Sequence, residues 1–469
     1  MPRFLQSYHL SLILVAMLVV AACSDPAPQT SSPTAQPEQS ESRQGYDPAM
    51  ARTLAVQSMQ IEDAAQAEAA LRQATSLAPT MIDGWLLLAS VRLRQGDLDG
   101  AFGHLEQVSG LGVRPPVDVF APLQPLHADP RWSDLLAKLD QYRTPEGASD
   151  VLFTLTENDL LTEGIAYDAQ RDTWYVSAVH GRKIVQIGPD GTISDWLADR
   201  EDLWGVFGLA VDGERRRLWA ATAAMPQMRG FDAEAGMQTA LLELDLEKAE
   251  IVGRYELPPA ASAASEPSAD APPAGRQLND LVVAQDGTVY TTDLRPPGGI
   301  YRLVPGSGGL ERVGESMLLN SPQGIALLDG DSILVVADYS LGLVALDLAT
   351  GESWFVEPSA DLWLQALDGL VAFGDGELVA IQNGRYPPHR ILRLQLDADR
   401  RRVTSWSVAA RALPEWREPT LGTVVRDGTL SRFVYVAASQ WALFPDGGEP
   451  DVAQLEPPKI MSLELASSP

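Results

Sequence analysis

The sequence predicts a six-bladed β-propeller that follows a small all-helical domain. Two observations support this fold class. After residue 150, a unit of short apolar strands and Gly-Asp turns recurs six times, and four strands in about 45 residues are typical of a propeller blade. Between residues 46 and 145, small and large apolar residues instead follow a helical spacing. The chain, with 469 residues, is long enough for both parts.

The first 22 residues are predicted to be a signal peptide. Arg3 precedes an apolar run from Leu10 to Ala22, which is shorter than the roughly 20 residues that span a bilayer. The run ends in "VAAC", and this ending resembles a bacterial lipobox. The resemblance implies cleavage before Cys23, lipidation of Cys23 and, because Ser24 follows, sorting to the outer membrane. An uncleaved anchor or an ordinary secretory cleavage is the alternative.

Residues 23–45 are rich in Pro, Ser, Gln and Glu, and are predicted to form a disordered tether. We therefore expect a cell-envelope protein that faces the periplasm and touches the membrane through its lipid anchor only. Lys and Arg total 35 against 63 Asp and Glu, giving a net charge of −28, which argues against a nucleic-acid partner. The acidic surplus fits either cation binding or simple solubility.

The helical domain, residues 46–145, contains a repeated pattern of apolar positions. The matching positions are Ala67, Leu71 and Ala74, then Ala101, Leu105 and Val108. Their period of about 34 residues, with Trp85 before the second set, resembles tetratricopeptide repeats. Because about three repeats are needed for a stable array, we expect this domain to form a short array or to lean on the propeller. Either a protein-docking groove or a helical spacer would fit.

The propeller is predicted over residues 150–466. Its six units open at "EGIAYD", "FGLAVD", "NDLVVA", "QGIALL", "DGLVAF" and "LGTVVR". The stretch "PPAASAASEPSADAPPAG" enlarges the second unit and is predicted to be an exposed loop. "DVLFTL", residues 150–155, is expected to add a strand that closes the ring onto the last blade. A β-sandwich or two smaller β domains is the alternative.

The residue that opens each unit is expected to face the central channel, since the first strand of a blade lines it. These residues are Glu163, Phe207, Asn279, Gln323, Asp368 and Leu421. Four of them carry side-chain oxygens, and a buried carboxylate is costly unless something compensates its charge. A hard divalent cation would satisfy all four oxygen donors together. The lack of Cys and His in this register argues against zinc.

This register resembles the gluconolactonase/regucalcin family and its relatives, the paraoxonases and the strictosidine synthase-like proteins. Glu163 in "TEGIAYD", Asn279 in "LNDLVV", Gln323 in "SPQGIAL" and Asp368 in "LDGLVAF" fall on the metal-binding positions of the family. The resemblance implies a six-bladed propeller with a divalent ion, calcium above all, in its channel.

The resemblance also implies hydrolysis of a lactone or ester, with Asp368 acting as both metal ligand and general base. His180, Arg276 and Asn383 are the candidates for substrate binding. Two residues depart from the family pattern. Gln323 stands where the family has asparagine, and Phe207 stands where paraoxonases place a histidine.

A non-enzymatic function is the second hypothesis. The propeller would then be a binding or sensing platform with a structural ion, and the helical domain would recruit a partner. The helical domain and the lipid anchor favour this hypothesis, whereas Glu163, Asn279 and Asp368 favour the hydrolase.

Overall fold

A computed structural model describes residues 45–257, 275–296, 298–314, 317–427 and 430–465. The predicted signal peptide, Cys23, nearly all of the tether and most of the predicted loop insertion lie outside these residues. Within the described ranges, no helix is both long enough and apolar enough to cross a membrane.

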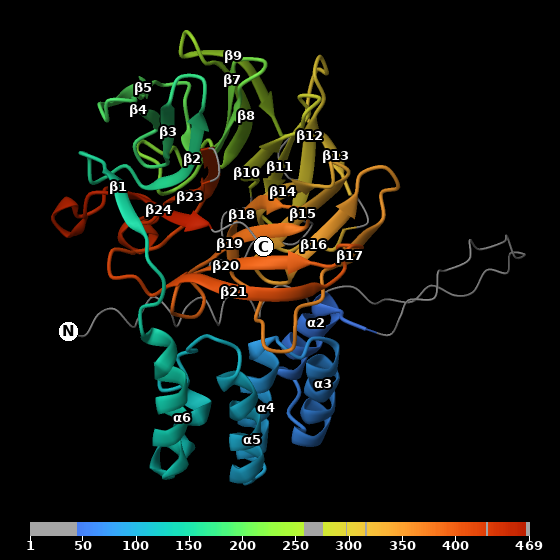
Figure 1. Cartoon of the computed structure of the whole chain (residues 1–469). Helices are drawn as coiled ribbons and strands as arrows, with labels where there is room; N and C mark the ends of the chain where they lie inside the picture. Colours follow the sequence, from blue (N-terminus) through green and yellow to red (C-terminus); the bar gives the residue numbers. More distant parts are fainter. Residues whose placement is uncertain (1–44, 258–274, 297, 315–316, 428–429, 466–469) are drawn as a thin grey trace, which may run out of the picture.

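The structure is a six-bladed propeller, as predicted, and the alternative of a sandwich or two β domains is wrong (Figure 1). Each blade is a four-stranded antiparallel sheet. Blade 1 contains β2 (Thr162–Asp168), β3 (Thr173–Ala178), β4 (Lys183–Ile187) and β5 (Ile193–Leu197). Blade 2 contains β6 (Gly205–Asp212), β7 (Arg217–Ala224), β8 (Gln238–Asp245) and β9 (Glu250–Glu256). Blade 3 contains β10 (Leu278–Val283), β11 (Val289–Asp293), β12 (Gly299–Leu303) and β13 (Glu311–Val313).

The remaining blades follow the same plan. Blade 4 contains β14 (Pro322–Leu328), β15 (Ile333–Asp338), β16 (Gly342–Asp347) and β17 (Ser353–Phe355). Blade 5 contains β18 (Leu367–Gly374), β19 (Glu377–Gln382), β20 (Arg390–Leu396) and β21 (Val403–Arg411). Blade 6 contains β22 (Gly422–Asp427), β23 (Leu430–Val436) and β24 (Lys459–Leu465), and its outer strand is β1 (Asp150–Thr154).

The ring closes where β1 joins the last blade, as the sequence predicts. β1 pairs antiparallel with β24, from Asp150 opposite Ser462 to Thr154 opposite Lys459. The Tyr435 hydroxyl donates to Ser149 Oγ at 2.8 Å, and Ser149 Oγ donates to the Ser462 carbonyl at 2.9 Å. Strands from the two ends of the propeller sequence are therefore joined in one sheet.

In several blades a glycine directly follows the residue that opens the repeated unit, because the inner strands of neighbouring blades approach closely there. A Cβ on Gly164 would lie 2.5 Å from the Phe207 carbonyl oxygen, and one on Gly324 would lie 2.4 Å from that of Asp368. A side chain at either position would push two blades apart. The recurring glycine in the sequence pattern is thus a packing requirement of the channel wall.

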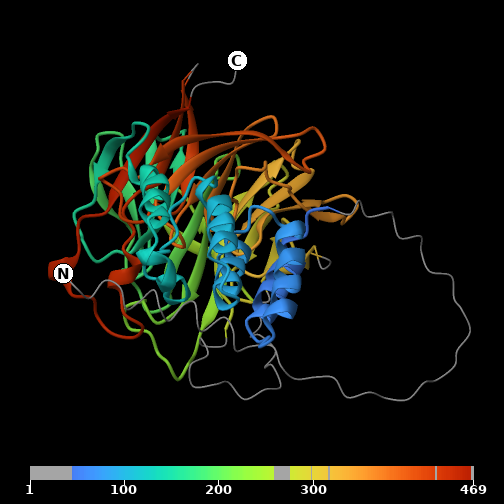
Figure 2. The same cartoon turned by 90° about the horizontal axis from the view of Figure 1, so that it is seen from below.

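The helical domain lies against one side of the propeller (Figures 1 and 2). Its helices are α2 (Pro48–Ser58), α3 (Ala64–Leu77), α4 (Ile82–Arg94), α5 (Leu98–Ser109) and α6 (Arg131–Asp140), with short 3-10 turns at Ala121–Ala128 and Gln141–Arg143. Asp47, Asp63 and Asp97 cap α2, α3 and α5 by accepting a backbone N–H. In both views α4 and α5 lie between α3 and α6.

The helical domain and the propeller share one hydrophobic core. Leu105, Leu123 and Leu126 of the helical domain belong to the same buried cluster as Trp363 and Tyr386 of the propeller. At the edge of this core, the buried Arg390 donates to the Gly112 carbonyl at 3.1 Å. The helical domain is therefore built onto the propeller rather than tethered beside it.

Candidate functional site

The predicted donors lie at one end of the central channel, where the inner strands begin. Glu163, Asn279, Gln323 and Asp368 occupy β2, β10, β14 and β18, and these inner strands contact one another around the ring. In blade 6, Thr420 takes the corresponding place rather than Leu421. A Cβ on Gly369 would meet the Thr420 carbonyl oxygen at 2.5 Å, and Thr420 Oγ1 donates to the Glu163 carbonyl at 2.8 Å. The offset arises because the glycine of this unit, Gly422, lies two residues after Thr420, so a pattern that expects the opening residue directly before a glycine selects Leu421.

Asn279 and Gln323 hydrogen-bond to each other. The Asn279 Nδ2 donates to Gln323 Oε1 at 2.8 Å, and Gln323 Nε2 donates to Ser321 Oγ at 3.3 Å. The extra methylene of Gln323 lets its amide oxygen reach the neighbouring blade. Asn279 Oδ1 accepts no hydrogen bond from the described residues and is free to act as a ligand.

Asp368 is buried, with 6% of its surface exposed, and Asn383 holds it in place. Asn383 Nδ2 donates to Asp368 Oδ2 at 2.6 Å and to the Pro419 carbonyl at 2.8 Å. The Tyr339 hydroxyl donates to the Asn383 carbonyl at 2.8 Å, which fixes the backbone of this loop. Burial raises the pKa of Asp368 to about 6, although the Asn383 bond acts in the opposite direction.

Glu163 is equally buried, with 4% of its surface exposed. The indole of Trp441, which lies in the loop between β23 and β24, donates to Glu163 Oε2 at 2.9 Å. Burial, and then the charge of Asp368, raise the pKa of Glu163 well above its usual value. One indole hydrogen bond does not offset the cost of burying this charge. Ionisation of either carboxyl, Glu163 or Asp368, therefore disfavours ionisation of the other.

Two further acids face the same site, and the repeat pattern did not single them out as donors. Burial, and then the charge of Asp368, raise the pKa of Glu418 to about 7. Burial raises the pKa of Asp280 to about 7, with a smaller contribution from Asp368. Asp280 directly follows Asn279, so its position was visible in the sequence. Glu418 precedes the sixth inner strand, and no recurring motif marks it.

These residues fit a hard divalent cation. Within the described ranges, no group of three or more His, Cys, Asp or Glu side chains is arranged to hold a metal by itself. The donor set is instead two carboxylates and two amides. Glu163 Oε1 and Asp368 Oδ1 accept no hydrogen bond from the described residues, while the second oxygen of each is held. Oxygen donors of this kind suit calcium, and two carboxylates would balance its charge.

The channel continues behind the donors as a cavity of about 380 Å³. Inner-strand residues such as Asp280 line it, together with Asp331 from the turn between β14 and β15. The four predicted donors are not part of its wall. They therefore lie at the end of the channel, and Asp280 lies between them and the interior.

The three predicted substrate-binding residues have different surroundings. Asn383 lies beside Asp368, as described above. His180 is buried between the Gln227 carbonyl, 2.7 Å from Nδ1, and Glu449, 3.1 Å from Nε2. The Arg276 Nε lies 3.6 Å from Asp293 Oδ2, and its guanidinium lies 5.2 Å from the centre of the Tyr301 ring. No contact joins His180 or Arg276 to the four donors within the described residues.

Phe207 contributes an apolar wall at the same end of the channel. Its ring stacks on Trp441 with the ring centres 6.2 Å apart, and it is fully buried. The residue thus supports the indole that contacts Glu163. It offers no proton acceptor.

The helical domain reaches the site through the loop of residues 383–390. Asp83 of α4 accepts a hydrogen bond from the Tyr386 hydroxyl at 2.6 Å and is paired with Arg385. The Arg114 backbone N–H donates to the Pro387 carbonyl at 2.7 Å. The loop that carries Asn383 is consequently held on one side by Asp368 and on the other by the helices.

The sequence matches no protein-family model and no curated protein. Solved six-bladed structures are similar in fold. A gluconolactonase from Xanthomonas campestris has 18% identity and a TM-score of 0.43, over 68% of this chain and 91% of that chain. A calcium-binding regucalcin from Agrobacterium tumefaciens has 15% identity and a TM-score of 0.44, over 69% and 96%. The Malassezia sympodialis allergen Mala s 1 has 14% identity and a TM-score of 0.49, over 67% and 96%. A fold does not by itself determine activity, which depends on the residues of the site.

Proposed function

We propose that the protein is a divalent-metal-dependent hydrolase of a lactone or ester, with calcium as the metal. The observation that carries the proposal is the pairing of two buried carboxylates, Glu163 and Asp368, at the end of the channel. Each has a raised pKa, and each has one oxygen that accepts no hydrogen bond from a described residue. Asn279 and Gln323 would complete the protein ligands.

Asp368 suits the role of general base. In the metal-free site its pKa of about 6 leaves it largely ionised at neutral pH, and a bound cation would favour the ionised form further, so it would be available to accept a proton. In the proposed step, water attacks the carbonyl carbon and Asp368 accepts the proton of that water. The C–O bond then breaks, and the proton passes to the departing alkoxide oxygen, giving a carboxylic acid and an alcohol.

Other residues would position the reacting groups. Asn383 holds one oxygen of Asp368, which would leave the other for the cation and the attacking water. Phe207 and Trp441 exclude solvent from the side of Glu163. The bound cation would supply electrostatic polarisation of the substrate carbonyl.

The proposal is tested by assaying the protein on a panel of lactones and aryl esters, with calcium and with EDTA. We expect EDTA to abolish hydrolysis and D368N to lower kcat about 100-fold or more, the range usual for loss of a general base. D331N is the matched control, because Asp331 lines the far part of the channel cavity. Hydrolysis that resists both EDTA and D368N would contradict the proposal.

A binding platform with a structural ion is the second candidate function. The bond between Asn279 and Gln323 favours it, because that bond engages the oxygen that the family would offer to the metal. Calcium binding in calorimetry without turnover of any substrate in the panel would support this candidate. A protein partner of the helical domain belongs to the same candidate.

We further propose that the protein is lipid-anchored through Cys23 in the bacterial outer membrane, facing the periplasm. The support is the "VAAC" motif after the apolar run. Incorporation of an alkyne-labelled fatty acid in a bacterial host is expected for the natural sequence and absent in C23S. Labelling that persists in C23S would contradict this anchor.

A further inference from the structure

Residues 440–451, which we call the strap, cross the donor end of the propeller. The strap follows β23 of blade 6, and the indole of its Trp441 contacts Glu163 of blade 1. Phe444 of the strap belongs to the same buried cluster as Phe207 of blade 2. The strap therefore extends from blade 6 over blade 1 to blade 2 and covers part of the candidate site.

The donors are too deeply buried for a lactone or ester to reach them in this closed form. Glu163, Asn279 and Asp368 are all buried. If the proposed function holds, part of the cover must therefore move. The helical domain shares a hydrophobic core with the propeller, whereas residues 445–449, the tip of the strap, are all exposed. Exposed segments with few buried apolar contacts open most readily, so the strap is the part of the cover suited to move.

Two hydrogen bonds fasten the middle of the tip to blade 2. The Gly447 N–H donates to the Pro226 carbonyl at 3.2 Å, and the Gln227 side-chain amide donates to Asp446. Gly447 and Gly448 have φ values of +72° and +133°, which residues with a side chain rarely adopt. This turn can therefore change its backbone conformation at little steric cost once its bonds are broken.

His180 provides a third contact with the tip, and both of its ring nitrogens face acceptors. Nδ1 lies 2.7 Å from the Gln227 carbonyl oxygen, and Nε2 lies 3.1 Å from Glu449 Oε2. An imidazole donates through both nitrogens only as the cation, because the neutral ring carries one N–H. The neutral ring would lose one of the two bonds and turn a lone pair toward an oxygen. The Phe444 ring, whose centre lies 5.2 Å from that of His180, also favours the cation.

The other charged side chains described around His180 already have partners. Arg229, whose backbone N–H donates to the His180 carbonyl at 3.2 Å, pairs with Asp159 at 2.7 Å. The two cations that follow His180 in the chain also pair with acids, namely Arg182 with Asp199, and Lys183 with Glu157 and Asp195. Asp446 of the tip accepts from Gln227. Among these described groups, Glu449 is the one whose charge faces the ring directly.

We propose that the strap is a gate over the candidate site and that the contact between His180 and Glu449 is its pH-sensitive latch. The latch is complete while the ring is charged, and it loses a hydrogen bond as the ring loses its proton, which histidines do between about pH 5 and 8. The gate is therefore held closed at low pH and opens more readily as pH rises. Opening would move Trp441 away from Glu163 and expose the donors. That opening admits a substrate rests on the proposed function, whereas the latch does not.

Hydrogen exchange in the full-length protein tests the latch without a substrate. The reporters are the Gly447 amide and the Trp441 indole N–H, which are followed by NMR, with each rate compared with the intrinsic rate at the same pH. We expect the protection of both to be lower by about fivefold or more at about pH 8 than at about pH 5.5, because a hydrogen bond between charged groups is lost. His180→Gln should remove this pH dependence.

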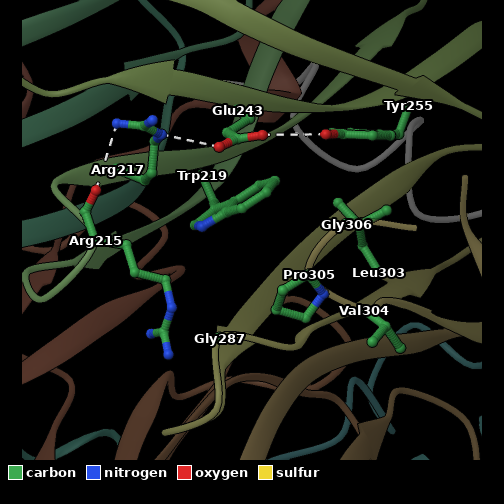
Figure 3. A pocket seen from close by; sticks show the side chains of 10 residues that line it. All are labelled: Arg215, Arg217, Trp219, Glu243, Tyr255, Gly287, Leu303, Val304, Pro305 and Gly306. Atoms are coloured by element: carbon green, nitrogen blue, oxygen red, sulfur yellow. Dashed lines mark hydrogen bonds and ion pairs between the residues drawn. The ribbon is translucent and has the colours of Figure 1, made fainter. Parts of the chain in front are cut away.

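Two further variants complete the test. Glu449→Gln removes the charge at the tip and should also remove most of the pH dependence, and this variant should fold normally because the Glu449 side chain is 67% exposed. Glu243→Gln is the matched control, because Glu243 lies elsewhere in blade 2, in the wall of a cavity of about 220 Å³ between blades 2 and 3 (Figure 3). There it accepts from Arg217 Nε at 2.9 Å and from the Tyr255 hydroxyl at 3.1 Å, so E243Q should leave the pH dependence unchanged.

Equal protection at both pH values in the natural protein would overturn the latch, and so would a pH dependence that persists in H180Q and E449Q. Loss of protection at Gly447 with an unchanged Trp441 indole would overturn the gate, because Trp441 would still cover Glu163. These results are separate from hydrolysis. A protein that opens as expected but turns over no lactone or ester would support the latch and contradict the hydrolase alone.

Discussion

Glu163 belongs to a group of buried carboxyls at the candidate site. Together with Asp368, Asp280 and Glu418 it forms an acidic cluster in which each carboxyl has a raised pKa. Burial is the first cause for every member, and the charge of Asp368 acts on the other three. The cluster cannot be fully ionised at low cost unless a cation enters.

The pH dependence of stability follows from these raised pKa values. The native carboxyls keep their protons to higher pH than the unfolded ones, so their contribution is complete at about pH 4. It is lost as pH rises from about 4 to about 6 or 7, at about 1.4 kcal/mol per carboxyl for each pH unit. We expect the EDTA-treated protein to melt at a lower temperature at pH 8 than at pH 5. Added calcium should remove most of this difference in melting temperature, as measured by thermal denaturation.

Glu163→Gln tests the contribution of the carboxylate charge at nearly constant side-chain volume. The variant removes one carboxylate from the cluster and keeps the side-chain volume, so the metal-free protein should become more stable at pH 8. Its calcium affinity, measured by calorimetry, should fall at least tenfold because one charged ligand is lost. Unchanged calcium affinity would show that Glu163 is not a ligand.

The repeat pattern allows prediction of site residues on the inner strands, but not of site residues in the connecting segments. Glu163, Asn279, Gln323 and Asp368 recur in register, so one motif points to all of them. Glu418 and Trp441 come from connecting segments that have no counterpart in other blades. The assignment of Leu421 in place of Thr420 has another cause, because Leu421 stands where most units have glycine and Gly422 follows it one residue later.

At the scale of elements, the loop of residues 383–390 connects α4 with β18. Asp83 contacts Tyr386 and Arg385, Asn383 contacts Asp368, and the loop backbone joins the two sets. The sequence predicted the helices and the blades, and packing of the helices on the propeller as one of two alternatives, but not the residues of their joint core. Trp363 and Tyr386 lie between strands, where no periodicity indicates what they pack against.

Asp83→Ala tests this connection. The change leaves Tyr386 and Arg385 without their acceptor, so the free energy of unfolding should fall by about 1–3 kcal/mol. Denaturant titration measures the change. Asp99→Ala is the matched control, since the side chain of Asp99 is 89% exposed and its pairing with Arg131 should contribute less than about 1 kcal/mol. Equal effects of the two variants would contradict the argument.

At the scale of the whole molecule, the shared core joins the helices and the propeller into one unit. Domains with small polar interfaces unfold separately, but here buried leucines of the helical domain pack on Trp363. Calorimetry of the full-length protein should therefore show a single transition, with helical and strand signals lost together. Two resolved transitions would mean that the interface is weaker than its burial indicates.

The position of β24 between β23 and β1 has a consequence for biosynthesis. β24 follows all the other described strands in the sequence, so β1 must wait without its sheet partner until nearly the whole propeller has been translated. A nascent chain that stops before Lys459 would expose two strand edges, which readily pair with other chains. Ring closure is thus a late event, and nascent chains should depend on chaperones until β24 emerges.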